Sequence, residues 1–316
     1  MLTSHMDKRP FGKTGFDSSV ISFGAMRLIN PETSTPTLLH ALERGINMID
    51  TARAYGNSEE LVGKALKEWR GQRPFIATKV FPNPGNWRNF VPLEEAYTPA
   101  GIIDSVETSL RELRVDQIDL LQLHQWYYLW THRPEWLDTF RKLREQGKIR
   151  FWGISAQDHE HDAALQVVDM GLVDSVQIIL NLFESRPLEA FIPLCGQKQT
   201  AIIARCVLDA GGISDSHTVD SLRKIPYFKG FEKVYAERLV ILKERFGKYA
   251  DTLPELAIRF ALTHPAVSTL AMGMGSARSI DASIAAAEKG PLPQDVFEDI
   301  NENYRWVKNF YQHGKF

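Results

Sequence analysis

The feature that most constrains this chain is the regular alternation of short apolar runs with longer amphipathic stretches. Strand-like apolar runs occur at residues 20–24, 48–50, 74–80, 118–124, 148–155, 175–180, 200–207 and 268–274. Continuously apolar strands that alternate with helices are typical of a parallel sheet buried on both faces. Eight such units favour a closed barrel. A doubly wound sheet is disfavoured because no GxGxxG motif follows the first run.

The stretches between and after these runs predict the helices of an α/β fold, a (β/α)8 TIM barrel with extra C-terminal helices. They lie at residues 35–44, 58–69, 99–113, 135–147, 160–170, 188–198, 232–246, 254–263, 279–288 and 294–309. Ser58 is a candidate N-cap. The segment FGKTGF (11–16) predicts an N-terminal β-hairpin that covers the barrel floor. Because no linker is evident, we expect one domain over residues 1–316, with residues 1–5 resembling a cloning remnant.

The composition excludes several classes of function. With 44% hydrophobic residues and a formal net charge of −2, the chain is typical of a globular protein without a nucleic-acid footprint. No apolar run approaches the ~20 residues of a membrane helix, and no secretory leader is evident, so we expect a cytoplasmic protein. The two cysteines, Cys195 and Cys206, lack metal-ligand spacing and are expected to be reduced thiols. The sequence does not predict an oligomeric state.

Ionisable side chains end several of the predicted strands. Asp50, Lys79 and His124 end the second, third and fourth strands, and Tyr55 lies on the loop that begins at Asp50. In a parallel barrel the carboxyl ends of the strands form one rim, where active sites are found. Any one of these residues alone could be a structural cap. Their arrival at one rim from adjacent strands favours a catalytic role for the set.

This combination suits proton donation to a carbonyl that is becoming an alkoxide. The phenol of Tyr55 has an ordinary pKa near ~10, and a neighbouring ammonium such as Lys79 lowers it. Asp50 would keep the lysine charged and aimed, and His124 would hydrogen-bond the reacting oxygen. A metal is not expected, because only one histidine joins the group and the carboxylates lack a ligand grouping.

The motifs MIDTARAYGNSEELVGKAL, FIATKV, LLQLH, GKIRFWGIS and VQIILN, in this order, resemble the signatures of the aldo-keto reductase family. The resemblance spans roughly residues 8–290. It implies a (β/α)8 barrel that binds a nicotinamide cofactor, usually NADPH, and that transfers hydride reversibly between cofactor and carbonyl or alcohol. It also implies that Tyr55 is the general acid, that Lys79 lowers its pKa, that Asp50 pairs with Lys79, and that His124 orients the substrate.

The resemblance also implies a cofactor site. By position, the contacts fall at Gly24, Ala25, Asp50, Ser155, Gln177, Arg205, Val207, Gly212, Ser276 and Arg278. Ser155 and Gln177 would bind the nicotinamide carboxamide, and Ala156 replaces the asparagine that usually follows the serine. Arg205 stands where many relatives place an aromatic residue that stacks on the nicotinamide. Arg278 favours a 2′-phosphate, hence NADPH over NADH.

The substrate pocket and the direction of the reaction are less constrained. Aromatic loops follow Lys79 and His124, and Trp87, Trp126 and Tyr127 are the candidate walls. The substrate could be an aldehyde or ketone, or a sugar or polyol in the oxidative direction. The alternatives are a cofactor-binding regulatory subunit that resembles potassium-channel beta subunits, and a barrel hydrolase or lyase. His132, His159 and His161, beyond the strand ends, are expected on the surface.

Overall fold

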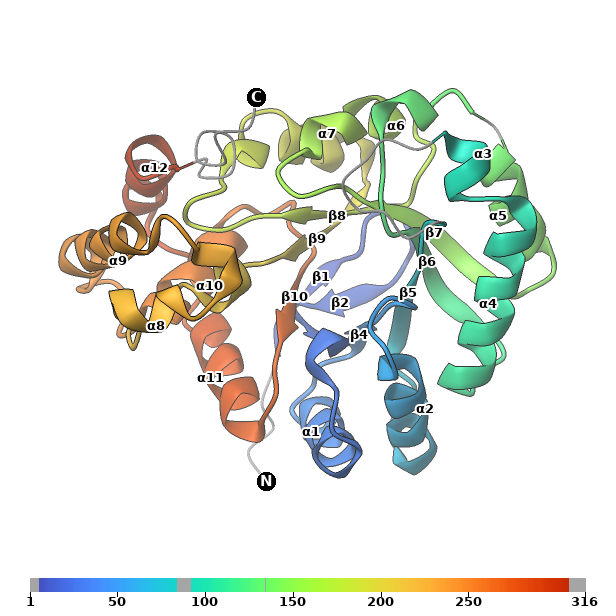
Figure 1. Cartoon of the computed structure of the whole chain (residues 1–316), viewed down its shortest axis with the longest axis horizontal. Coiled ribbons are helices and arrows are strands. Elements are labelled where there is room, and N and C mark those ends of the chain that lie inside the picture. Colours follow the sequence, from blue (N-terminus) through green and yellow to red (C-terminus); the bar gives the residue numbers. More distant parts are fainter. Residues whose placement is uncertain (1–5, 84–91, 134, 307–316) are drawn as a thin grey trace.

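The computed structural model describes residues 6–83, 92–133 and 135–306 and forms a closed barrel of eight parallel strands (Figure 1). In order around the barrel these are β3 (Ile21–Gly24), β4 (Met48–Asp50), β5 (Phe75–Val80), β6 (Ile118–Leu123), β7 (Ile149–Ser155), β8 (Ser175–Ile179), β9 (Ala201–Arg205) and β10 (Thr269–Gly273). Strand β10 pairs with β3 and closes the ring. The predicted (β/α)8 barrel is therefore confirmed. The predicted cloning remnant lies outside the described residues.

Helices surround the barrel (Figure 1). They are α1 (Pro31–Glu43), α2 (Ser58–Glu68), α3 (Leu93–Ala96), α4 (Pro99–Leu113), α5 (Glu135–Glu145), α6 (Leu165–Asp169), α7 (Phe191–Lys198), α8 (Val219–Arg223), α9 (Glu232–Phe246), α10 (Leu253–Thr263), α11 (Ala277–Glu288) and α12 (Gln294–Asn303). Short 3-10 turns are η1 (Ala25–Arg27), η2 (Tyr128–Trp130), η3 (His161–Ala164), η4 (Arg186–Leu188), η5 (Asp209–Gly211) and η6 (Pro226–Phe228). No helix in the described ranges has the length and apolar character needed to span a membrane.

Several helix boundaries differ from the predicted ones for identifiable reasons. Helix α1 begins at Pro31 rather than at residue 35, because the Asn30 side chain accepts the Glu32 N–H and proline suits the first helical position. Ser58 is the first residue of α2 and not its cap: its hydroxyl donates to the Ala25 carbonyl at 2.9 Å. The last helix ends at Asn303, short of the predicted residue 309.

The N-terminal hairpin closes the barrel at the end where the strands begin. Strands β1 (Lys8–Pro10) and β2 (Asp17–Ser19) pair antiparallel, as the sequence predicted. The rings of Phe16 and Phe75 stack at 4.5 Å between centroids, and Phe11 lies 5.4 Å from Phe75. These rings pack on buried side chains of the barrel interior and fill the floor, opposite the rim that carries the ends of the strands.

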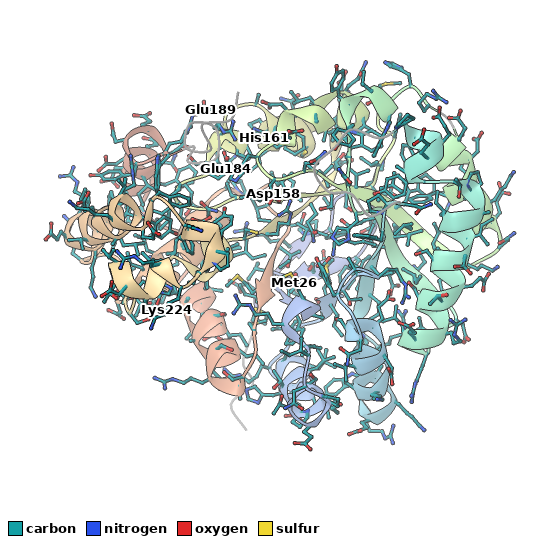
Figure 2. All side chains as sticks on the ribbon, viewed as in Figure 1. Met26, Asp158, His161, Glu184, Glu189 and Lys224 are labelled. Carbon is teal, nitrogen blue, oxygen red and sulfur yellow. The ribbon has the colours of Figure 1, made fainter. Side chains whose placement is uncertain are left out.

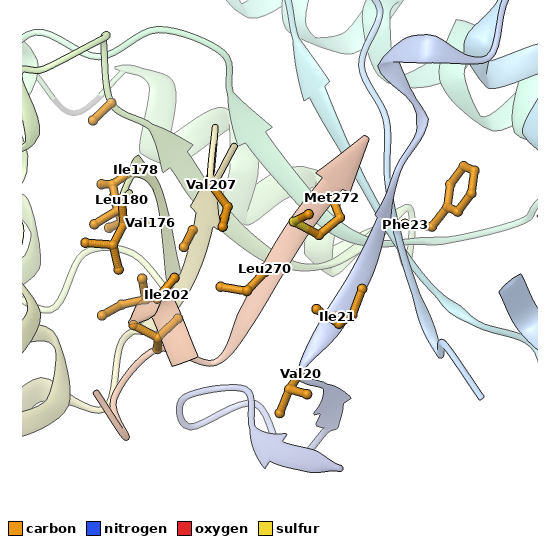
Figure 3. Packing of buried hydrophobic residues seen from close by; sticks show 14 of the residues in the cluster. Val20, Ile21, Phe23, Val176, Ile178, Leu180, Ile202, Val207, Leu270 and Met272 are labelled. Atoms are coloured by element: carbon orange, nitrogen blue, oxygen red, sulfur yellow. The ribbon is translucent and has the colours of Figure 1, made fainter. Parts of the chain in front are cut away.

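A second, larger apolar cluster lies between the strands and the helices. Figure 3 shows part of it along β3, β8, β9 and β10, where Ile21, Leu270, Ile202 and Val176 are fully buried. These residues explain the continuous apolar runs of the sequence, because one face of each strand packs on helices and the other fills the barrel. The packing fixes the strand ends that carry the polar residues.

Candidate active site

A buried ion pair lies at the open rim. The Lys79 ammonium donates to both carboxylate oxygens of Asp50, at 2.8 and 2.7 Å, and to the Thr51 carbonyl at 2.9 Å. Lys79 has no exposed surface, and Asp50 is 4% exposed. Asp50 also accepts an N–H from the Gln177 amide at 2.9 Å. A lysine buried to this extent requires such a partner, because an unpaired buried charge is strongly disfavoured.

Tyr55 lies against this pair. The Lys79 ammonium is 5.1 Å from the centroid of the phenol ring, and the ring of His124 packs edge-on at 5.5 Å. Burial raises the pKa of Tyr55, the charge of Lys79 lowers it, Asp50 raises it and Arg205 lowers it, and the net shift is upward. The sequence correctly predicted that the ammonium lowers this pKa. It missed that burial outweighs the ammonium, so the phenol keeps its proton.

His124 stays neutral at this rim. Burial lowers its pKa well below the ordinary value, and the positive charges of Lys79 and Arg205 lower it further. Its backbone N–H donates to the Val80 carbonyl at 3.1 Å, which fixes the end of β6 beside the end of β5. A neutral imidazole can either donate or accept a hydrogen bond, so it suits contact with a carbonyl or hydroxyl oxygen.

Two adjoining cavities open at this rim. The larger has a volume of about 850 Å³, and its described lining residues are Met26, Ile29, Ala54, Tyr55, Gly56, Asn57, Phe81, His124, Gln125, Ser155, Ala156, Gln157, Asp158, Gln177 and Arg205. The smaller, about 230 Å³, shares Met26, Tyr55, Gln177 and Arg205 with it and extends toward β10. Figure 2 labels Met26 and Asp158 among these residues. The cavities form an elongated space with the phenol at their junction.

The chain was compared with known proteins. The model of the "Aldo/keto reductase family" matches residues 20–305. "Uncharacterized oxidoreductase YqkF" of Bacillus subtilis is 28% identical and covers 94% of this chain and 96% of its own length. "NADH-specific methylglyoxal reductase" of Escherichia coli is 26% identical over 89% of this chain and 93% of its own length. The holo form of aldo-keto reductase AKR11C1 from Bacillus halodurans aligns with a TM-score of 0.78 and 29% identity, over 94% of this chain and 96% of that one.

This chain belongs to the aldo/keto reductase family. It is an oxidoreductase that acts on carbonyls with a nicotinamide cofactor. The structure of this aldo/keto reductase offers space and donors that fit such a group. Gln177 and Ser155 line the larger cavity, and Gly24 lines the smaller one, where a Cβ atom would lie 3.0 Å from the Met272 carbonyl. An elongated cavity with amide and hydroxyl groups at one end suits a dinucleotide.

Arg205 forms one wall of both cavities in this aldo/keto reductase. Its guanidinium donates to the Ala156 carbonyl at 2.9 Å and to the Asp158 carboxylate at 2.8 Å. Burial lowers the pKa of Arg205, but the negative charge of Asp158 outweighs burial and raises the pKa above its ordinary value, so the guanidinium stays charged. A planar guanidinium held in this way can stack on a flat ring.

The loop after β9 lines the smaller cavity. Val207 and Gly211 are among its lining residues, whereas Gly212 is not: a Cβ at Gly212 would lie 2.3 Å from the Phe228 ring. Gly211 therefore faces the cavity, whereas Gly212, which the resemblance implied as a cofactor contact, packs on core side chains. Asp209, at a φ of 47°, is held by a 2.8 Å hydrogen bond from the Tyr235 hydroxyl.

The remaining predicted cofactor residues, Ala25, Ser276 and Arg278, line neither cavity. Ala25 is buried with its carbonyl bound to Ser58, and it does not line either cavity. Ser276 caps α11 by accepting the Ser279 N–H at 3.2 Å. Arg278 is exposed in the first turn of α11 and lines neither cavity.

The predicted substrate walls need correction. Trp87 lies outside the described residues. Trp126 has no exposed surface, donates its indole N–H to the Ala163 carbonyl at 3.1 Å and packs on Trp136, so it is a core residue. Tyr127 accepts a 2.8 Å hydrogen bond from Gln125, and it is Gln125 that lines the cavity.

Sequence reasoning also missed polar and apolar residues around the site. Met26, Asn57, Phe81, Gln125 and Gln157 line the larger cavity. Each follows shortly after a strand end or lies on the Tyr55 loop, and that position is the only signal in the sequence that could have identified them.

Two predicted surface histidines are buried. His159 and His161 are 9% and 5% exposed. His159 contacts the buried carboxylate of Glu184, which also accepts hydrogen bonds from Arg186 at 2.7 and 2.6 Å. Figure 2 labels Glu184 and His161 beside α7.

Proposed function

We propose that this aldo/keto reductase is an NADPH-dependent oxidoreductase that either reduces an aldehyde or ketone to the alcohol or catalyses the reverse reaction on a sugar or polyol. The observation that supports this most is the meeting of Tyr55, His124 and the Lys79–Asp50 pair where the two cavities join. In this proposal Trp87 is also a candidate pocket wall.

The proposed chemistry divides between the cofactor and the side chains. A bound nicotinamide supplies the hydride in the reductive direction. Tyr55 donates its proton to the carbonyl oxygen, and His124 orients that oxygen by a hydrogen bond. The resulting phenolate is stabilised by the nearby Lys79 ammonium, whose position is held by both oxygens of Asp50. The high pKa of Tyr55 suits an acid that must stay protonated until the carbonyl oxygen becomes basic.

The cofactor would lie along the two cavities. Gln177 and Ser155 would bind the carboxamide, Arg205 would stack on the ring, and the Gly24 and Gly211 regions would approach the sugar phosphates. Arg278 and Ser276 lie at the start of α11, where phosphate is favoured by the helix N-terminus. The exposed Arg278 favours the 2′-phosphate, hence NADPH, although a relative from Escherichia coli carries the name NADH-specific.

A substitution of Tyr55 tests the proposal. We expect Tyr55→Phe to lower carbonyl reduction by roughly 10²–10⁴-fold, because the proton donor is lost. NADPH binding, measured by fluorescence titration, should change little. Tyr128→Phe is the matched control, because Tyr128 is 60% exposed and its hydroxyl lines neither cavity.

Two outcomes would contradict the proposal. Full activity in Tyr55→Phe would remove Tyr55 from the acid role. A wild-type protein that binds NADPH but reduces no aldehyde or ketone, and oxidises no sugar or polyol, would favour the regulatory-subunit alternative.

A further inference from the structure

Arg27 occupies a position that the cofactor residues predicted from the sequence do not include. It is the last residue of the η1 turn, directly after β3. Its guanidinium Nη2 lies 3.4 Å from the position that a Cβ on Gly211 would take. Its Cδ and Nε lie 3.7 and 3.8 Å from the equivalent position on Gly273, at the end of β10. The side chain therefore runs along the wall of the smaller cavity, between the β9 loop and β10.

The charge of Arg27 is not neutralised by the described protein. Within the described ranges its guanidinium makes neither an ion pair nor a hydrogen bond, and the residue is exposed. By contrast, Arg205 in the same cavity is paired with Asp158. A guanidinium presents several N–H donors in a planar fork that matches phosphate oxygens. Arg27 therefore has its donors available for an anion.

The surrounding wall also suits an anion. Besides Arg27, the described lining of the smaller cavity includes three glycines, Gly24, Gly211 and Gly273. Glycine lets a ligand approach the backbone closely. The one carboxylate among the lining residues, Asp50, is already paired with Lys79. A phosphate at this wall would meet one free cation and no free carboxylate.

The position along the cavity decides which phosphate fits. The smaller cavity includes Tyr55 and Gln177, so it begins at the nicotinamide end. The diphosphate bridge of a dinucleotide is one ribose away from the nicotinamide, whereas the 2′-phosphate is on the far ribose. We infer that Arg27 binds the diphosphate bridge of the cofactor, a contact common to NADPH and NADH. This inference rests on the proposed function and adds a residue to its site.

Ligand titration of variants tests the inference. The probes are NADPH, NADH and ADP-ribose, which carries the diphosphate without nicotinamide. We expect Arg27→Met and Arg27→Gln to weaken all three by about tenfold, as for a lost charge-assisted hydrogen bond. Arg27→Lys should recover part of the loss. Arg278→Met should weaken NADPH alone, and Arg141→Met, which removes an exposed arginine of α5, should change none of them.

The outcomes separate this inference from the proposed function. Wild-type protein that binds neither NADPH nor NADH overturns both. If the wild type binds the probes, and Arg27→Met and Arg27→Gln bind all three within about twofold of the wild-type affinity, only the role of Arg27 is overturned. A loss confined to NADPH also overturns it, because it places Arg27 at the 2′-phosphate. Thermal unfolding of each variant confirms folding, which exposed Arg27 should not affect.

Discussion

Tyr55 lies among opposed charges, and burial raises its pKa above the ordinary value. Lys79 and Arg205 lower its pKa, while burial and Asp50 raise it. Because Asp50 binds Lys79 through both carboxylate oxygens, its negative charge offsets part of the effect of the ammonium on the phenol. The site therefore keeps Tyr55 protonated, and the neighbouring Lys79 ammonium stabilises the phenolate once the proton has been transferred.

The ionisation of Tyr55 can be measured directly. We expect no phenolate from Tyr55 below pH ~10 in the protein without cofactor, because its pKa is raised above the ordinary value. In Lys79→Met the pKa should rise further, because the largest lowering cause is removed. The measurement is the phenolate absorbance of wild type minus that of Tyr55→Phe. Phenolate absorbance from Tyr55 below pH ~10 would show that the charge of Lys79 outweighs burial and lowers the pKa.

Single residues differ in how far the sequence could predict them. The strand ends placed Asp50, Lys79 and His124 at one rim, because parallel strands share the direction of their carboxyl ends. The orientation of Gln125 and Trp126 could not be predicted in this way. Both follow a strand, but one faces the cavity and the other the core, and loop conformation decides between them.

At the scale of elements, Arg9 adds a polar contact to the aromatic packing that joins the hairpin to the barrel. Arg9 of β1 donates to the carbonyls of Leu262, His264 and Val267 at 2.6, 3.1 and 2.9 Å. These carbonyls lie at the end of α10 and in the turn before β10, where backbone oxygens lack helical partners. A cation at a helix C-terminus is also favoured by the helix dipole.

Removing the Arg9 hydrogen bonds should destabilise the hairpin end of the barrel without changing the active site at the opposite rim. We expect Arg9→Met to lower the free energy of unfolding by about 2 kcal/mol, because several charge-assisted hydrogen bonds to carbonyls are lost. Urea denaturation measures this, and carbonyl reduction well below the transition should be unchanged. Lys8→Met, at the exposed neighbouring position, is the control. Equal urea midpoints for Arg9→Met and wild type would contradict the stabilising role of Arg9.

Elements were predicted from the sequence more reliably than their junctions. The hairpin and the strand order followed from turn residues and apolar runs. The Arg9 contact was not predictable, because it joins residues more than 250 positions apart in the sequence. Helix α1 could start at Pro31 only because Asn30 caps it, a signal that lies before the amphipathic pattern.

At the scale of the whole molecule, the chain after α12 returns to the loop that follows β8. The Arg305 guanidinium donates to the Ser185 hydroxyl at 3.2 Å, and the Trp306 N–H donates to the Phe183 carbonyl at 2.9 Å. Between these two anchor points lies Glu184, which is 1% exposed and bound by Arg186 and His159. The loop after β7 therefore meets the loop after β8 at one buried carboxylate, and the segment after α12 contacts the residues on either side of it.

Glu184 makes the stability of the molecule depend on acid pH. Burial raises its pKa, but hydrogen bonds from Arg186 and His159 outweigh burial and hold the pKa at about 2, below the ordinary 4.5. As pH falls, the unfolded chain protonates Glu184 first, so the stabilisation from its ionised carboxylate is complete above pH 4.5 and is lost between about 4.5 and 2.

We expect Glu184→Gln to lower the free energy of unfolding by roughly 3 kcal/mol near neutrality. The difference from wild type should shrink through that window in urea denaturation. Glu189→Gln removes an exposed partner of Arg305 and should cost below ~1 kcal/mol. A Glu184→Gln difference that stays constant from neutrality to pH 2 would show that the carboxylate is not held in its ionised form.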